Sequence, residues 1–250
     1  MADLDNRVLR GATTAGTIDT GLRAYMLKVY NYMTGALALT GVVAYVVANS
    51  PSLLNLFFQT AVGANGTAAL QPTMLGWVVM LAPLGLVFFL SFRVMHMSLA
   101  AAQATFWAYA GLVGASLASI LIVYTGASVA LTFFVTAATF GAMSLWGYTT
   151  KRDLTGFGSF LFMGLIGVLI AAVANMFFRS PAIDFVVSVL GVLVFTGLTA
   201  WDTQKIKNTY YQVGHDGTLA GKMAVMGALS LYLDFLNIFL FLLRFLGNRR

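Results

Sequence analysis

The sequence predicts an all-α integral membrane protein, a bundle of seven transmembrane helices without a soluble domain of appreciable size. Of its 250 residues, 60% are hydrophobic and only 9% are charged, and the mean hydropathy is +0.86. A soluble domain usually carries about 25% charged residues. A chain of this length also buries only about three quarters of its surface when it folds. Lipid must therefore solvate much of this chain.

Seven apolar runs have about the 20 residues that a helix needs to cross the hydrocarbon layer. In chain order they cover residues 26–48, 73–93, 101–124, 128–148, 156–178, 183–204 and 223–246. Only residues 125–127 separate the third run from the fourth, so these two helices form a tight antiparallel pair. The connection from Asn49 to Pro72 is uncharged and rich in Gly, Ala, Asn and Thr, which predicts a flexible loop.

No linker, shift in composition or run of charge divides the chain, so residues 25–250 are expected to form a single transmembrane domain. Residues 1–24 are polar and rich in Thr, Gly and Ala, and they lack the apolar core of a signal peptide. This segment is therefore predicted to be a short mobile N-terminal tail. The absence of cysteine excludes disulfides, thiolate metal sites and cysteine nucleophiles.

The positions of Lys and Arg predict the orientation of the bundle. With the N-terminus in the cytoplasm, ten of the 14 basic residues lie on the cytoplasmic side, as the positive-inside rule requires. Arg244, Arg249 and Arg250 oppose the rule, because an odd number of spans carries them to the far side. The last run could instead be re-entrant, but it is apolar enough to cross, so a true span is preferred. The basic residues fix topology, and we predict no nucleic-acid site and a location in a bacterial inner membrane.

Two aspartates fall inside the apolar runs, where a charge costs about 2.5–3.5 kcal/mol on insertion scales. All eight acidic residues are Asp, and the other six lie in the N-terminal tail, at helix ends or in loops. Asp234 is inside the last run, and Asp202 is near the end of the sixth. The rise of about 1.5 Å per residue of a helix places both at a similar depth. An ionisable residue inside a membrane is a functional hypothesis by default.

Small and polar residues share one face of the last run, which is expected to face protein or water. They are Gly227, Ser230, Asp234, Asn237 and Arg244. A purely structural interpretation remains for both aspartates. Asp202 could be an exposed carboxylate paired with Lys205 or Lys207, and Asp234 could pair with a buried donor. Arg93, at the cytoplasmic end of the second run, could form an ion pair with Asp202 or extend to the lipid headgroups.

The last two runs carry two specific motifs. They are Trp201-Asp202-Thr203-Gln204, and Leu231-Tyr232-Leu233-Asp234-Phe235-Leu236-Asn237 followed by Phe239-Leu240 and Leu243-Arg244. With seven spans, these motifs resemble the Bax inhibitor family, also called the transmembrane Bax inhibitor motif family. The resemblance covers essentially the whole chain from about Arg23, including the Tyr-Asn-Tyr-Met sequence at the start of the first helix.

The resemblance implies a bundle with the last helix at its centre, in which Asp202 and Asp234 form a proton-sensitive pair that controls a calcium leak. Arg93 matches an arginine that the family pairs with the sixth-helix aspartate. From their place on the polar face of the last run, and not from the resemblance, Ser230 and Asn237 are expected to support the pair. Some members carry further acidic residues within their helices, whereas this chain has no Glu at all. The ion path from the pair to the far side is therefore poorly specified.

Elementary chemistry makes this implied mechanism reasonable. Two carboxylates a few Å apart in a low dielectric do not both ionise cheaply, so the pair can hold one proton near neutral pH. When deprotonated, the pair offers up to four oxygens of the six to eight that calcium prefers. Protons and calcium would then compete for one site.

The sequence thus predicts a pH-sensitive calcium leak channel that is not an enzyme, needs no cofactor and interacts with lipid, calcium ions and protons. One alternative is a regulator without transport activity that binds another membrane protein, such as the membrane-anchored AAA protease that bacterial relatives are thought to modulate. A further alternative is an intramembrane aspartyl protease, whose second aspartate normally follows Gly-x-Gly, whereas Asp234 follows Leu231-Tyr232-Leu233. No metal-ligand cluster, phosphate loop or Ser/His/Asp arrangement indicates any other enzyme.

Overall fold

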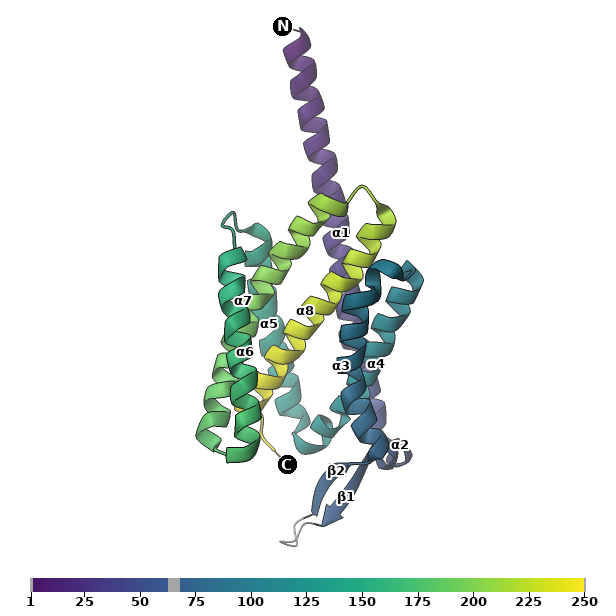
Figure 1. Ribbon diagram of the computed structural model, residues 1–250, viewed down its shortest axis with the longest axis vertical. Coiled ribbons are helices and arrows are strands. Elements are labelled where there is room, and N and C mark those ends of the chain that lie inside the picture. Colours follow the sequence, from purple (N-terminus) through teal and green to yellow (C-terminus); the bar gives the residue numbers. More distant parts are fainter. Residues whose placement is uncertain (1, 63–67, 250) are drawn as a thin grey trace.

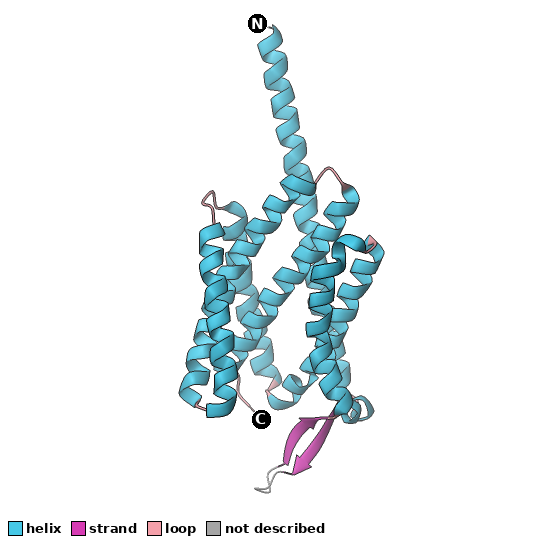
Figure 2. Cartoon of the chain, viewed as in Figure 1, coloured by secondary structure: helices cyan, strands magenta, loops and turns pink. Residues whose placement is uncertain are grey.

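The computed structural model describes residues 2–62 and 68–249, and it is built almost entirely of helices (Figures 1 and 2). The long helices are α1 (Ala2–Asn49), α3 (Met74–Arg93), α4 (Leu99–Val123), α5 (Gly126–Thr149), α6 (Thr155–Phe178), α7 (Pro181–Val213) and α8 (Gly217–Leu246). Within the described residues, each of these helices contains a segment long and apolar enough to cross a membrane. The predicted seven-helix membrane bundle is confirmed.

Several helices begin at a side chain that accepts a hydrogen bond from a free backbone N–H of the first turn. Thr73 accepts from the amide of Gly76 at the start of α3, and Asp216 accepts from the amide of Thr218 at the start of α8. From Asp216, α8 runs unbroken through the bundle, and the two chain ends lie at opposite ends of it (Figure 1). The last segment is therefore a through-going helix rather than a re-entrant one.

The connection between the first two spans is structured, so the prediction of a flexible loop was wrong for its described residues. It contains α2 (Pro51–Phe57) and an antiparallel hairpin of β1 (Phe58–Val62) and β2 (Ala68–Pro72), with Phe58 opposite Pro72. Proline at the first position of α2 favours the helical start. Phe58 is buried in a cluster with Val47 and Val79, so tertiary packing gives this uncharged segment its order.

The first helix extends well beyond its membrane segment. The span begins at Thr20, whereas the helical backbone of α1 begins at Ala2 and projects away from the bundle (Figure 1). The predicted mobile tail, residues 1–24, falls mostly on residues whose side chains lie outside the described part of the chain. That assignment stays a prediction.

The last helix lies at the centre of the bundle, as predicted. It packs against α1, α4, α5 and α7. In its most apolar stretch 61% is buried, compared with 17–39% for the other six spans. Leu231, Tyr232 and Ile238 are completely buried there. Any group on α8 is therefore held by several helices at once.

Helices α5 and α7 approach closely at Gly147. A Cβ atom added at Gly147 would overlap the carbonyl oxygen of Ala200 and would lie 2.8 Å from the Ala200 Cα. Only glycine permits this backbone approach. The contact lies two residues before Asp202 on α7, so it helps to position the candidate site.

Candidate functional site

Asp234 is buried in the centre of the bundle. It lies on α8 and is 4% exposed, and its neighbours Tyr232 and Phe235 are also buried. Among the described residues, no group donates a hydrogen bond to Oδ2 of Asp234. A buried carboxylate oxygen without a donor is costly. This oxygen is therefore available to a proton, a water molecule or a cation.

The structure brings the two predicted aspartates together. The carboxyl groups of Asp202, half-buried on α7, and of Asp234 on α8 lie close enough to interact directly. The two helices lie side by side and are joined by a short turn (Figure 1), which sets both residues at a similar depth. Because two carboxylates have only acceptor atoms, a hydrogen bond between these side chains would require one proton.

The two nearby lysines are engaged elsewhere. Lys205 is close enough to Asp202 to act on it electrostatically, but its Nζ lies over the ring of Trp201, 4.8 Å from the centroid. Lys207 donates a hydrogen bond of 2.8 Å to the carbonyl oxygen of Tyr148. Within the described residues, neither lysine forms an ion pair with Asp202. The structure thus favours the carboxyl pair over an exposed carboxylate paired with lysine.

Arg93 is not part of this arrangement. It is exposed at the end of α3, a helix that packs mainly on α4, and in the described part of the chain it forms no ion pair with Asp202. The predicted gating ion pair is therefore absent from this conformation. The exposed side chain agrees instead with the alternative in which Arg93 extends to the lipid headgroups.

The polar face of α8 is directed partly at α7. A Cβ at Gly227 would lie 3.0 Å from Ile206 of α7, and Ser230 and Asn237 are both half-buried. The amide of Asn237 donates to the carbonyl oxygen of Leu233 at 2.8 Å, within its own helix. Ser230 lies about one helical turn before Asp234, and Asn237 about one turn after it. Their supporting role remains a prediction.

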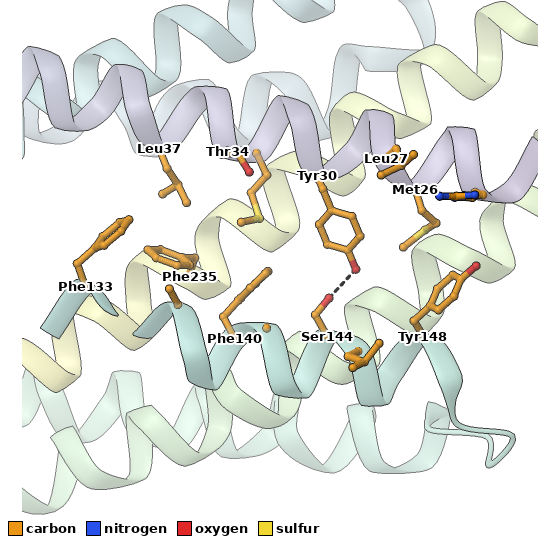
Figure 3. Close-up of a pocket in the computed structure, with 15 residues that line it drawn as sticks. Met26, Leu27, Tyr30, Thr34, Leu37, Phe133, Phe140, Ser144, Tyr148 and Phe235 are labelled. Carbon is orange, nitrogen blue, oxygen red and sulfur yellow. Dashed lines mark hydrogen bonds between the residues drawn. The ribbon is translucent and has the colours of Figure 1, made fainter. Parts of the chain in front are cut away.

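A chain of hydroxyl groups that the sequence reasoning missed reaches the site from α1. Tyr30 is hydrogen-bonded to Ser144 of α5 at 2.6 Å (Figure 3), and Ser144 to Thr203 of α7 at 2.9 Å. Thr203 follows Asp202 directly and donates to the carbonyl oxygen of Thr199. The signal was the recurrence of Ser and Thr at multiples of four residues along the fourth apolar run.

A second polar junction lies on the other side of α8. Thr40 donates to the carbonyl oxygen of Ala110 at 2.9 Å and is hydrogen-bonded to the hydroxyl of Tyr232 at 2.7 Å. This junction ties α1, α4 and α8 together two residues before Asp234. From the sequence, Tyr232 is identified only as part of the motif in the last run, without a hydrogen-bond partner.

The carboxyl pair alone does not make a complete calcium site. The described residues contain no group of three or more His, Cys, Asp or Glu side chains that could hold a metal ion. The pair supplies up to four oxygens, and calcium takes six to eight. A calcium ion at the pair would need carbonyl, hydroxyl or water ligands in addition.

The fold and the site define a class of small multi-pass membrane proteins with an ionisable pair on a central helix and its neighbour. A family model described as inhibitor of apoptosis-promoting Bax1 matches residues 22–250. The chain is 51% identical over 236 residues to an uncharacterized protein of Rickettsia prowazekii, covering 94% of this chain and 93% of the relative. It is 47% identical over 231 residues to the inner membrane protein YbhL of Escherichia coli K12, covering 92% and 94%. The chain belongs to the Bax inhibitor family.

Proposed function

We propose that this protein is a pH-sensitive calcium leak channel in which the pair Asp202 and Asp234 is the gate. The observation that supports this function is the close approach of two carboxyl groups on neighbouring helices, one of them buried deep in the bundle with an oxygen that has no hydrogen-bond donor among the described residues. Such a pair is costly to keep in a membrane, and a purely structural link between α7 and α8 does not need it.

In the proposed mechanism, the shared proton holds α7 and α8 together through the hydrogen bond. Loss of that proton leaves two negative charges side by side in a low dielectric, which repel each other and require water or a cation. Calcium meets this requirement with its preference for carboxylate oxygens. Protons and calcium therefore compete for the pair, and acidification favours the closed arrangement.

The half of the bundle beyond Asp234 is packed with apolar side chains. Phe235, Ile238, Phe239 and Leu243 are all buried on α8. The cavity beside Phe235 and Phe239 has a volume of about 140 Å³ and is lined mainly by apolar groups. A hydrophobic constriction of this kind blocks ions by excluding water. In the proposed mechanism this conformation is the closed one, and conduction requires α8 to move away from its neighbours.

The test is calcium entry into liposomes containing the purified protein and an entrapped dye, measured across a series of buffers from about pH 6 to about pH 8, because two interacting carboxyl groups lose their protons in separate steps. Asp202→Asn and Asp234→Asn are compared with the native chain. The control is Asp153→Asn, which removes an exposed carboxylate in the loop before α6. We expect flux that falls on acidification, a loss of this pH dependence in both pair variants, and native behaviour in the control. Flux no greater than in empty liposomes for all proteins would refute the leak function.

A second candidate is a non-transporting regulator that binds a membrane protein such as a membrane-anchored AAA protease. The helical extension of α1 beyond its span supports this candidate, because it offers a surface outside the membrane (Figure 1). Deleting residues 2–19 would then abolish regulation of the partner, and the native chain would give no calcium flux above that of empty liposomes. If the channel is the main function, Asp234→Asn would instead remove the pH dependence of the flux and leave regulation of the partner unchanged.

We further propose a bacterial inner membrane as the location, with the N-terminus in the cytoplasm. The bias of Lys and Arg supports the orientation, and the similarity to the inner membrane protein YbhL of Escherichia coli supports the membrane. We propose no catalysed reaction and no cofactor for this protein. An aspartyl protease would also lose activity in the Asn variants, so cleavage of a transmembrane peptide by the native chain would distinguish it from a channel.

A further inference from the structure

A long groove separates α1 from α5 on the outside of the bundle. Its volume is about 680 Å³, within the range of about 300–1,000 Å³ that small-molecule sites occupy. Figure 3 shows side chains of α1 and α5 facing each other across it, with Phe235 of α8 between them. Both walls pack on the central helix, which gives the groove a fixed floor.

The groove has the length of a lipid chain. On α1 it extends from Arg23 to Leu37, a distance of about 21 Å at the usual helical rise, and on α5 from Phe133 to Tyr148, about 22 Å. One leaflet of a bilayer contributes about half of a hydrocarbon core of about 30 Å. The groove is therefore long enough to hold an extended acyl chain along its whole depth in the leaflet.

The walls are apolar and open sideways. Leu27 is 52% exposed, Phe133 43% and Leu145 64%, and all three line the groove. In a spanning bundle such surface faces the hydrocarbon, so the groove is filled from the bilayer rather than from water.

One end of the groove is positively charged. Arg23 lines it one turn before Leu27, and Tyr148 lies at the same end on the opposite wall. Lys207 is held beside Tyr148, with its Nζ 5.2 Å from the ring centroid and hydrogen-bonded to the backbone carbonyl. An apolar channel that ends at cations complements a molecule with a long hydrocarbon chain and an anionic head.

We propose that this groove is a binding site for an anionic phospholipid, with one acyl chain between α1 and α5 and the phosphate at Arg23. The site is independent of the proposed channel function. It is connected to the aspartate pair, however, because the hydrogen bond from Tyr30 to Ser144 crosses the groove and continues to Thr203, next to Asp202. An acyl chain bound in the groove would contact the hydrogen bond between Tyr30 and Ser144 directly. The lipid is therefore placed to affect the position of α5 against α7.

The test is native mass spectrometry of the purified full chain in a neutral detergent, with phosphatidylglycerol or phosphatidylcholine added in turn. Gly141→Phe fills the groove, because a Cβ at Gly141 meets nothing within 4 Å and the residue lines the groove. Gly85→Phe on α3 is the matched control, since Gly85 is equally open and lies outside the groove. Arg23→Gln removes the charge alone.

We expect the native chain to retain one phosphatidylglycerol about fivefold better than phosphatidylcholine, the factor expected for one arginine beside a headgroup of net negative charge, because the choline of phosphatidylcholine neutralises its own phosphate. Arg23→Gln should abolish this preference, Gly141→Phe should lose both lipids, and Gly85→Phe should behave as the native chain. Inorganic phosphate should not displace the lipid.

Three results would overturn the proposal: equal retention of the two lipids by the native chain, unchanged retention by Gly141→Phe, or a second protein copy in place of the lipid. Circular dichroism checks that each variant is folded, and Arg23→Gln decides the question if Gly141→Phe does not fold.

Discussion

Replacing Gly147 with alanine tests how closely α5 and α7 must approach beside the aspartate pair. The new Cβ would lie 2.8 Å from the Cα of Ala200, whereas carbon atoms in contact are normally about 3.5–4.0 Å apart. The two helices must therefore separate by about 1 Å. Overpacking of this kind costs about 1–3 kcal/mol, against a gain in helix propensity of about 0.8–1.0 kcal/mol.

The same substitution at Gly141 gives the control, because this residue lies on the same helix and its Cβ would meet nothing within 4 Å. Both variants gain the same propensity, so their difference isolates the steric cost. We expect Gly147→Ala to be less stable than Gly141→Ala by about 1–3 kcal/mol in the free energy of unfolding. The measurement is equilibrium unfolding in mixed micelles, followed by circular dichroism. Equal stability of the two variants would show that α5 and α7 are not in close contact at Gly147.

Three further substitutions test other parts of the structure by the same unfolding measurement. Tyr232→Phe removes the 2.7 Å hydrogen bond to Thr40 and should cost about 0.6–1.7 kcal/mol, with a double-mutant cycle on Thr40 recovering most of that value. Arg179→Gly should stabilise the chain by about 1–2 kcal/mol, because Arg179 ends α6 with a φ of 49° that only glycine adopts without strain; an unchanged stability would contradict this conformation. Asp184→Asn breaks the 3.6 Å ion pair with Arg244, but both side chains are about half exposed, so the loss should stay below about 1 kcal/mol and disappear at high salt.

The membrane spans could be predicted from the sequence because lipid leaves so few alternatives. A backbone in hydrocarbon must satisfy its own hydrogen bonds, so each apolar run of sufficient length becomes a helix. The unusual cost of a buried charge identified Asp234 in the same direct way. In both cases, a local property of the sequence is enough to decide the structure.

The remaining features depend on how each helix is rotated against its neighbours, which no local pattern fixes. Tyr30 meets Ser144 because α1 and α5 turn these residues toward each other, and Arg93 is exposed because α3 packs on α4 rather than beside α7. The hairpin after α2 depends on the burial of Phe58 against distant residues. Tertiary packing overrides composition at each of these places.

The position of Asp234 on the central helix explains how one proton could control the whole bundle. A charge on a peripheral helix such as α6, of which only 17% is buried, could be relieved by a small rotation of that helix alone. Rotation of α8 alone cannot relieve a charge on Asp234, because α8 packs on α1, α4, α5 and α7. In the proposed mechanism, hydration of the deprotonated pair therefore requires α8 to shift against several helices together. The apolar packing around Phe235 and Phe239 lies on that same helix, so the movement that hydrates the pair also loosens the constriction beyond it.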